Sequence, residues 1–278
     1  MKEVITSRQN GCVKALCALS EKKHRKATGL FRLDGKKLFS EALFSDAEIV
    51  EVWLSEGASE TVRAAVEQAI GAGRLDELKV VFAAESVFEK LSLEVSPEGI
   101  ITVVRALDTL HRTLGADETL PRDGFGSEKL LIAESLRDAG NLGTVIRSCA
   151  ALGIDRLILS DDCAELYNPK ALRAAMGAIF RLPTLTVSAG RLPSVVGELR
   201  ASGRRVYAAA LREDALRIGE FPLGARDCFV IGNEGHGLSA ELIDACDASA
   251  IIPMREGNES LNAAAAAAVC IWETVRVK

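Results

Sequence analysis

Two kinds of apolar spacing alternate along the first part of the chain. Continuous apolar runs at residues 49–54 and 100–104 indicate buried strands, whereas apolar positions three and four apart at 10–19 indicate an amphipathic helix. The same criteria predict strands at 31–33 and 80–82 and helices at 36–43, 60–70 and 85–91. This alternation predicts a compact α/β domain over residues 1–105.

A second alternating pattern begins after residue 128. Its predicted strands cover residues 130–133, 156–159, 184–187, 204–209, 228–231 and 250–252, with helices between them. Strands that alternate with helices predict a mostly parallel sheet with helices on both faces. Asp, Glu, Gly, Pro and Thr dominate residues 115–128. We therefore expect a linker at 106–128 and a second α/β domain at 129–278.

Composition argues against several classes of protein. No apolar run approaches the ~18 residues that a membrane-spanning helix needs, and the polar start Met1-Lys2-Glu3-Val4 lacks the apolar region of a signal peptide. The seven cysteines show no paired spacing, and the three histidines form no metal-ligand pattern. We therefore expect a cytoplasmic protein without a membrane segment, a disulfide framework or a bound metal.

Charge is distributed unevenly along the chain. The net charge is −5, yet residues 1–40 carry ten Lys or Arg against three acidic residues, which leaves the remainder at −12. The densest basic run consists of Lys22, Lys23, Arg25 and Lys26. Such a run fits a solvated helix end. At one end of an otherwise acidic chain, it equally fits a surface that contacts a polyanion.

Three glycine-rich or polar segments follow predicted strands. The segment GNLGTVIR at 140–147 follows the strand at 130–133, and GNEGHG at 232–237 follows the strand at 228–231. The third segment, at 252–262, starts with Ile-Pro-Met and ends with Ser-Leu-Asn ahead of six alanines. Open α/β sheets bind ligands at the ends of their strands, where N–H groups at helix starts are free. Each segment alone also fits an ordinary turn or helix cap.

Taken together and in this order, the segments resemble the motifs of the SpoU/TrmH family of RNA ribose 2′-O-methyltransferases, part of the SPOUT superfamily. Asn141 and Arg147 match the first motif, Gly232-Asn233-Glu234-Gly235 the second, and Ile252-Pro253-Met254 with Ser260-Leu261-Asn262 the third. Between the first two motifs, Asn168-Pro169-Lys170, Arg173 and Met176-Gly177-Ala178 also match. Four segments that agree in order and spacing make the resemblance specific.

The first domain resembles the substrate-binding domain that precedes many SpoU-type catalytic domains, which is similar to a small RNA-binding ribosomal-protein fold. The matching residues are Ile5-Thr6-Ser7-Arg8-Gln9-Asn10 and Phe31-Arg32-Leu33-Asp34-Gly35. The family more often has Glu than Asp before that glycine. The resemblance further implies a C-terminal trefoil knot, a homodimer, an RNA substrate and S-adenosylmethionine as the methyl donor.

The resemblance also implies roles for single residues. Gly232, Ile252 and Leu261 are expected to line the S-adenosylmethionine pocket, largely through backbone groups. Arg147 is expected beside the target ribose and phosphate, held there by Asn141. A guanidinium group has a pKa above ~12 and rarely gives up its proton, so an electrostatic role for Arg147 and a role as general base both stay open.

The remaining polar motif residues are expected to support this arginine. Glu234 is expected to orient Arg147, Asn262 or the cofactor loop. Ser260 and Asn262 are expected to bind the substrate phosphate or to hold the arginine. Many relatives continue Ser-Leu-Asn with Val-Ser-Val, whereas this chain has three alanines. No polar role is therefore expected at Ala265.

Two other classes of function fit part of this pattern. An NAD-binding oxidoreductase needs G-x-G-x-x-G after a first strand, whereas Gly232, Gly235 and Gly237 have another spacing and come late in the chain. A non-catalytic RNA-binding protein could have the same fold, because fold alone does not determine function. The polar residues of the motifs are all present, which favours an enzyme. Ribosomal RNA and tRNA both fit as substrates, and the additional N-terminal domain favours rRNA.

Overall fold

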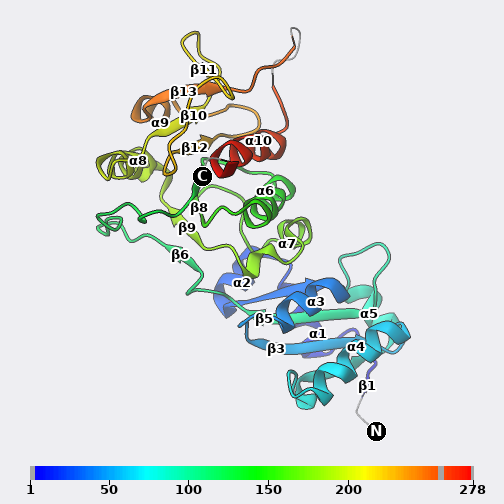
Figure 1. Ribbon diagram of the computed structural model, residues 1–278. Helices are drawn as coiled ribbons and strands as arrows, with labels where there is room; N and C mark the ends of the chain where they lie inside the picture. The colour runs from blue at the N-terminus through cyan, green and yellow to red at the C-terminus, as the bar shows by residue number, and fades with distance from the viewer. Residues whose placement is uncertain (1–3, 256–259, 277–278) are drawn as a thin grey trace. The chain divides into compact units, whose positions relative to one another are not determined.

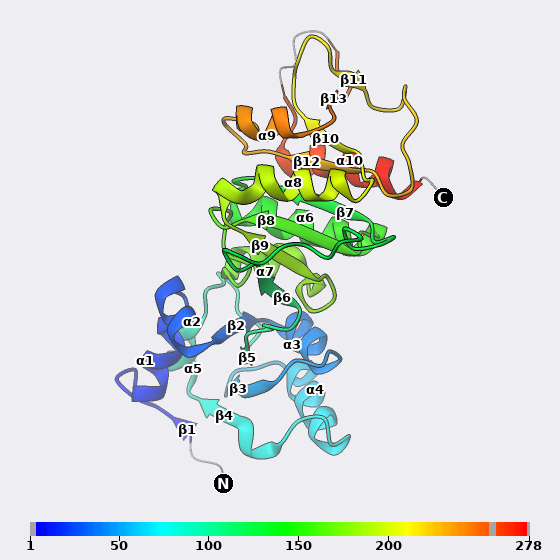
Figure 2. The ribbon, with the colours of Figure 1, turned by 90° about the vertical axis from the view of Figure 1, so that its left-hand side faces the viewer.

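The chain folds into two compact α/β units (Figures 1 and 2). The computed structural model describes residues 4–255 and 260–276. Unit 1 consists of Met1–Leu107 together with Tyr167–Phe180. Unit 2 consists of Asp108–Leu166 together with Arg181–Lys278.

Unit 1 contains a mixed sheet with the strand order β1-β4-β3-β5-β2. β5 runs antiparallel to its neighbours β2 and β3, whereas β1, β4 and β3 are parallel. The strands are β1 (Val4–Ile5), β2 (Leu30–Asp34), β3 (Ile49–Ser55), β4 (Val80–Ala83) and β5 (Ile100–Arg105). The helices are α1 (Gly11–Ala18), α2 (Lys22–Thr28), α3 (Lys36–Leu43), α4 (Glu60–Gly71), η1 (Glu77–Lys79), α5 (Glu85–Leu91), α7 (Pro169–Ala175) and η2 (Ala178–Phe180).

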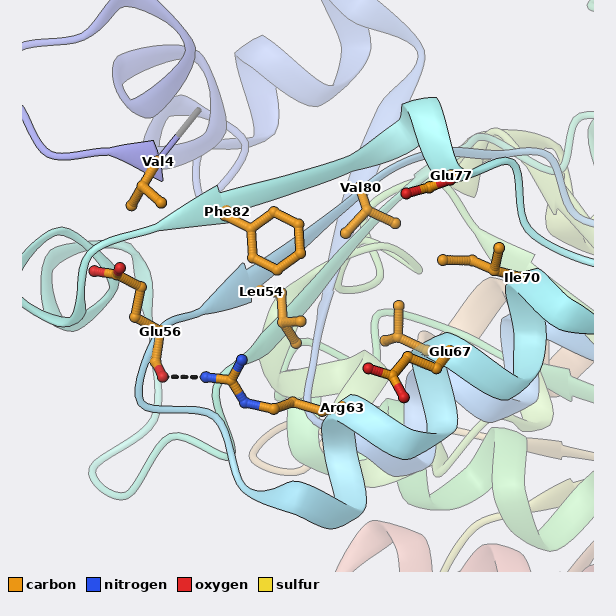
Figure 3. Close-up of a pocket in the computed structure, with 10 residues that line it drawn as sticks. Val4, Leu54, Glu56, Arg63, Glu67, Ile70, Glu77, Val80 and Phe82 are labelled. Carbon is orange, nitrogen blue, oxygen red and sulfur yellow. Dashed lines mark hydrogen bonds between the residues drawn. The ribbon is translucent and has the colours of Figure 1, made fainter. Parts of the chain in front are cut away.

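Apolar side chains on both faces of this sheet are covered by helices. On one face, Trp53 packs with Leu16 of α1 and Phe88 of α5 in a buried cluster. On the other face, Leu54 and Phe82 point toward α4 (Figure 3). Burying one large apolar side chain contributes roughly 1.5–3 kcal/mol, so these contacts stabilise the unit. The predicted α/β character of the first domain is confirmed.

The segment Tyr167–Phe180 belongs to unit 1, although the strand pattern predicted residues 129–278 as one domain. Tyr167 stacks on Phe31 with ring centroids 4.4 Å apart, and its hydroxyl accepts a hydrogen bond of 2.7 Å from the N–H of Leu107. These partners are distant from Tyr167 in sequence, so the local spacing of apolar residues could not predict the contacts. The segment therefore packs as part of unit 1, although the residues before and after it in the chain belong to unit 2.

Unit 2 contains a sheet with the order β11-β13-β10-β12-β7-β8-β9-β6, in which every neighbouring pair is parallel. Its strands are β6 (His111–Thr113), β7 (Leu130–Ala133), β8 (Arg156–Ser160), β9 (Thr184–Val187), β10 (Val206–Ala209), β11 (Leu216–Arg217), β12 (Cys228–Ile231) and β13 (Ala248–Ile251). The parallel sheet predicted for the second domain is confirmed.

Helices cover both faces of the parallel sheet, as Figure 1 shows. They are α6 (Ala139–Leu152), η3 (Ala189–Arg191), α8 (Leu192–Ala201), α9 (Ala240–Ala245) and α10 (Ala263–Arg276). α8 and α9 contribute Val195, Leu199 and Leu242 to a buried cluster with the strands. α6 and α10 pack against each other, and α10 also packs against β12.

Most of the segment predicted as a linker, 106–128, is part of unit 2. β6 extends the parallel sheet by pairing with β9, and Leu114 and Leu120 are buried in the core of the unit. A strand of three residues is too short to show an alternation of apolar and polar positions. The polar residues around β6 also made it look like part of a linker. We therefore assign residues 108–128 to unit 2 rather than to a free linker.

Within residues 4–255 and 260–276, none of the helices is long and apolar enough to cross a membrane. The same residues contain no group of three or more His, Cys, Asp or Glu side chains placed to hold a metal ion. The cysteines are free thiols, and burial raises the pKa of Cys228 and Cys270 to about 12. These two thiols therefore stay neutral core groups.

Candidate functional site

The three predicted motifs meet at the carboxyl ends of the strands of the sheet in unit 2. β7 and β12 are parallel neighbours, so the loops that follow them start side by side. The first loop leads into α6, and the second contains residues 232–238. The third motif leads into α10, which packs on both α6 and β12. The carboxyl ends of the strands are where open α/β sheets bind ligands.

The loop after β12 is shaped by Asn233 and by close backbone packing. Asn233 and Gly237 exchange two backbone hydrogen bonds of 2.9 and 3.0 Å. The side-chain oxygen of Asn233 accepts hydrogen bonds from the N–H groups of Gly235 and His236 at 2.8 and 3.1 Å. A Cβ atom on Gly232 would lie 2.4 Å from the carbonyl carbon of Gly237. Glycine is required at Gly232 because two backbone segments touch there.

Glu234 connects the second motif to the start of α6. Its carboxylate accepts hydrogen bonds from Asn141 Nδ2 at 3.0 Å and from the N–H groups of Asp138 and Arg137 at 3.3 and 3.4 Å. Burial alone would raise the pKa of Glu234, but these hydrogen bonds hold it below its ordinary value. Glu234 is therefore an ionised acceptor that orients Asn141. It forms no bond to Arg147 among the contacts of the described residues, contrary to one of our expectations.

Asn262 extends this connection to the third motif. Its Nδ2 donates to Asn141 Oδ1 at 3.0 Å, and its Oδ1 accepts from the N–H groups of Ala264 and Ala265 at 2.9 and 3.3 Å. Asn262 thus caps α10 and fixes Asn141 with the same amide group. Glu234, Asn141 and Asn262 form a continuous hydrogen-bonded chain through all three motifs.

Arg147 lies on α6 with its side chain exposed to solvent. Among the described residues, it makes neither a hydrogen bond nor an ion pair, so the expected contact with Asn141 is absent. Asn141 uses its amide for Glu234 and Asn262 instead. The guanidinium group, with five donors in a planar fork, is therefore available to an anionic ligand.

The other residues of the third motif are also accessible. Ser260 is exposed, Leu261 has 43% of its surface exposed, and Ile252 is half-buried. Asn262, and not Ser260, supplies the side-chain cap of α10. Glu259, which belongs to the same segment, lies outside the described residues.

Asp138 supports the site but was not singled out from the sequence. Its carboxylate accepts a hydrogen bond of 2.8 Å from the N–H of Asn141 and so caps α6. An Asp directly before a helical apolar pattern is a recognised N-cap signal, so the sequence contained the information. The cap fixes the backbone from which Asn141 reaches Glu234.

The basic run in unit 1 divides into exposed and buried members. Lys22, Lys23 and Lys26 are exposed on α2. Arg25 is only 4% exposed, and its Nη1 donates to the carbonyl oxygen of Leu19 at 2.8 Å. Arg25 faces the interior of the unit, so it is removed from the predicted RNA-contacting set.

A cavity of about 480 Å³ lies in unit 1 between α4 and the sheet (Figure 3). Leu54, Phe82 and Ile70 form its apolar wall, and Glu56 and Glu67 lie at its rim. It contains none of the motif residues.

Two family models match the chain. The SpoU rRNA Methylase family matches residues 128–272, and the MRM3-like substrate binding domain matches residues 10–102. A relative from Bacillus subtilis, the 23S rRNA (guanosine(2553)-2'-O)-methyltransferase RlmP, is 31% identical over 269 residues. That alignment covers 96% of this chain and 97% of the relative.

Solved structures of RNA methyltransferases also match the chain. A crystal structure of an RNA 2'-O ribose methyltransferase matches with a TM-score of 0.78 and 28% identity, covering 99% of this chain and 98% of that one. The AdoMet-bound rRNA methyltransferase from Sinorhizobium meliloti matches with a TM-score of 0.79 and 26% identity, covering 99% and 97%. Both likenesses extend over the two units.

Proposed function

Because the chain belongs to the SpoU rRNA Methylase family, we propose that it transfers a methyl group from S-adenosylmethionine to a ribose 2′-hydroxyl of ribosomal RNA. One observation carries the proposal. The hydrogen-bonded chain of Glu234, Asn141 and Asn262 brings all three motifs together at the carboxyl ends of the strands, and among the described residues it leaves Arg147 without a partner. Such a site has a fixed frame and an exposed cation for an anionic substrate.

The residues at these strand ends fit a nucleoside cofactor. Gly232 brings two backbone segments together, and the exposed Leu261 and half-buried Ile252 supply apolar surface. Apolar walls with a few main-chain partners suit an adenine ring. S-adenosylmethionine, when bound, supplies an electrophilic methyl group on a sulfonium. The chain's own task is to orient the ribose and to exclude water.

Arg147 is the residue that we assign to the substrate. Its exposed guanidinium can bind a backbone phosphate through two parallel hydrogen bonds and stabilise negative charge that develops on the 2′-oxygen. A guanidinium group rarely gives up its proton, which argues against a role as general base, so the proton leaves to water or to a phosphate oxygen. Ser260, exposed beside the start of α10, can donate a further hydrogen bond to the phosphate.

The function is tested with purified protein, tritiated S-adenosylmethionine and deproteinised rRNA. We expect label in rRNA, and we expect complete alkaline hydrolysis to leave that label in a dinucleotide, because a 2′-O-methyl group blocks hydrolysis of the adjacent phosphodiester. Label in mononucleotides after alkaline hydrolysis would place the methyl group on a base. Incorporation into tRNA but not into rRNA would contradict the proposed substrate.

We further propose that unit 1 holds the RNA and takes no part in the chemistry. Three exposed lysines on α2 carry its contact with phosphate: Lys22, Lys23 and Lys26. The match to the MRM3-like substrate binding domain over residues 10–102 supports this role. The net charge of −12 outside residues 1–40 makes this surface the main basic feature of the chain.

Reversing the three lysines to glutamate should weaken RNA binding and flatten its salt dependence by roughly 2 to 3 in log–log slope, because each phosphate contact contributes about 0.7 to 0.9. Arg25 is left unchanged because it is buried. Filter binding from 50 to 300 mM salt measures the slope. Lys90→Glu, on α5, is the matched control and should leave the slope unchanged. An unchanged slope in the triple variant would show that α2 does not contact RNA.

We also propose that the protein is a homodimer whose interface includes α10. Trp272 on this helix is 56% exposed, and exposed aromatic residues are enriched at protein interfaces. Twofold dimers are the commonest soluble assemblies. Light scattering at micromolar concentration should give about twice the chain mass of 29.7 kDa, and Trp272→Glu should give the single mass. A wild-type protein of single mass would contradict the proposal.

We propose that the C-terminal part of the chain forms a trefoil knot, in which the last helix, α10, passes through a loop. α10 follows the third motif and returns to pack on α6 and β12, in the middle of the sheet order. Knots are rare, so this proposal depends on the family resemblance as well as on the packing. An experimental backbone trace through residues 252–262 tests it directly. A trace in which α10 stays outside its neighbouring loops would contradict it.

A further inference from the structure

Ser135, in the loop between β7 and α6, has an unusual backbone conformation. Its φ is +54°, in the left-handed region that a residue with a Cβ atom rarely adopts. Holding such a residue there is energetically unfavourable, so surrounding contacts must stabilise it. Ser135 belongs to none of the three motifs.

Asp162, after the neighbouring strand β8, provides these contacts. Ser135 Oγ donates to Asp162 Oδ2 at 2.5 Å, and the N–H of Ser135 donates to Ser160 Oγ at 2.7 Å. Ser160 Oγ in turn donates to Asp162 Oδ1 at 2.6 Å. One carboxylate therefore binds both the side chain of Ser135 and the hydroxyl that accepts its backbone N–H.

The conformation of Ser135 matters because its carbonyl group meets the second motif. The carbonyl oxygen accepts a hydrogen bond of 2.7 Å from Asn233 Nδ2. Two and three residues further on, the N–H groups of Arg137 and Asp138 donate to the carboxylate of Glu234. Through these three hydrogen bonds, the backbone of residues 135–138 fixes the position of the loop after β12.

We propose that Asp162 is a positioning residue for methyl transfer: it holds Ser135 in the left-handed conformation and thereby places Asn233 and Glu234. This inference rests on the proposed function. Burial alone would raise the pKa of Asp162, but hydrogen bonds from Ser135, Ser160 and Arg137 hold it below its ordinary value. The carboxylate is therefore ionised at neutral pH, the state in which it accepts both hydroxyl hydrogen bonds.

The ion pair of Asp162 with Arg137 does not account for this role. Arg137 Nη2 lies 3.3 Å from Asp162 Oδ2, and the arginine side chain is 66% exposed. Exposed pairs of this kind contribute little to stability, because water screens the two charges. The two serine hydroxyls, which lie between the strands, are the partners through which Asp162 acts.

Asp162→Ala should lower kcat/KM for S-adenosylmethionine by roughly tenfold to a hundredfold, because the freed loop no longer presents Asn233 and Glu234 in place. Adding Ser135→Gly to this variant should restore most of the loss. Glycine adopts a φ of +54° without a Cβ clash and therefore does not need the carboxylate. Asp161→Ala removes the same charge one residue earlier and should leave kcat/KM close to that of the wild type.

The rescue by glycine, together with the stability of each variant, separates positioning from a general structural role. Glycine at a φ of +54° can also stabilise the fold, so the midpoint of thermal unfolding is measured on the same proteins. A purely structural defect would lower activity and the unfolding midpoint together, whereas lost positioning lowers kcat/KM in a folded protein. Calorimetry with S-adenosylmethionine is run on the same four proteins. Wild-type activity in Asp162→Ala, or a double variant that stays as impaired as Asp162→Ala, would overturn the inference. A wild type inactive on rRNA would overturn the proposed function instead, and cofactor affinity across the series would still decide the role of Asp162.

Discussion

Arg147→Ala should lower methyl transfer to rRNA by at least about a hundredfold, while the fold and the affinity for S-adenosylmethionine stay nearly unchanged. The guanidinium is exposed and has no partner among the described residues, so its removal breaks no internal contact. What is lost is the cation that binds the substrate phosphate and stabilises charge on the 2′-oxygen. Single-turnover rates with rRNA measure the first effect, and calorimetry with S-adenosylmethionine measures the second.

Two further variants make this test specific. Arg147→Lys keeps the charge but removes the planar fork, so it should recover only part of the rate. Arg112→Ala, on the edge strand β6, removes an exposed arginine that pairs with Glu118 and should leave the rate unchanged. Methyl transfer near the wild-type rate in Arg147→Ala would remove this arginine from the mechanism.

Gly232→Ala should abolish measurable binding of S-adenosylmethionine. The added Cβ would lie 2.4 Å from the carbonyl carbon of Gly237 and 2.6 Å from the N–H nitrogen of Leu238. Both atoms belong to the backbone, so the loop after β12 has to move. Because this loop carries Asn233 and Glu234, its displacement should disturb the cofactor pocket and the polar chain together.

Gly235→Ala is the matched control for this change. A Cβ there would meet Asn233 Oδ1 at 3.5 Å, an ordinary van der Waals distance. The backbone N–H of Gly235 that donates to Asn233 is retained in the alanine variant. Its effect on cofactor affinity should therefore be several-fold at most. Equal losses in Gly232→Ala and Gly235→Ala would mean that loop flexibility, not backbone contact, decides binding.

Elements with a strong local pattern were predictable from the sequence. The apolar runs at 130–133 and 228–231 coincide with β7 and β12, because fully buried parallel strands are continuous apolar stretches. β11 (Leu216–Arg217) was not predicted, since its two residues are both exposed and show no period. α2 was seen only as a charged run, because a helix that buries little besides Arg25 has no apolar stripe.

The site was predictable in its residues but not in its contacts. The motif pattern located Asn141, Glu234 and Asn262, yet only the fold shows that they bond to one another and that Arg147 has no partner in the described part of the chain. The burial of Arg25 contradicts the usual exposure of arginine, and it depends on the position of the Leu19 carbonyl oxygen. Asp162 was missed because its importance derives from the φ angle of Ser135, in the loop that follows the neighbouring strand β7.

The central claim is methylation of a ribose 2′-hydroxyl in rRNA, and it is tested most directly by mapping 2′-O-methyl groups in rRNA. The map is made from cells that contain the protein, from cells that lack it, and from cells complemented with Arg147→Ala. We predict that one methylated ribose disappears without the protein, returns with the wild-type chain and stays absent with Arg147→Ala. An identical methylation map in all three cell types would contradict the account.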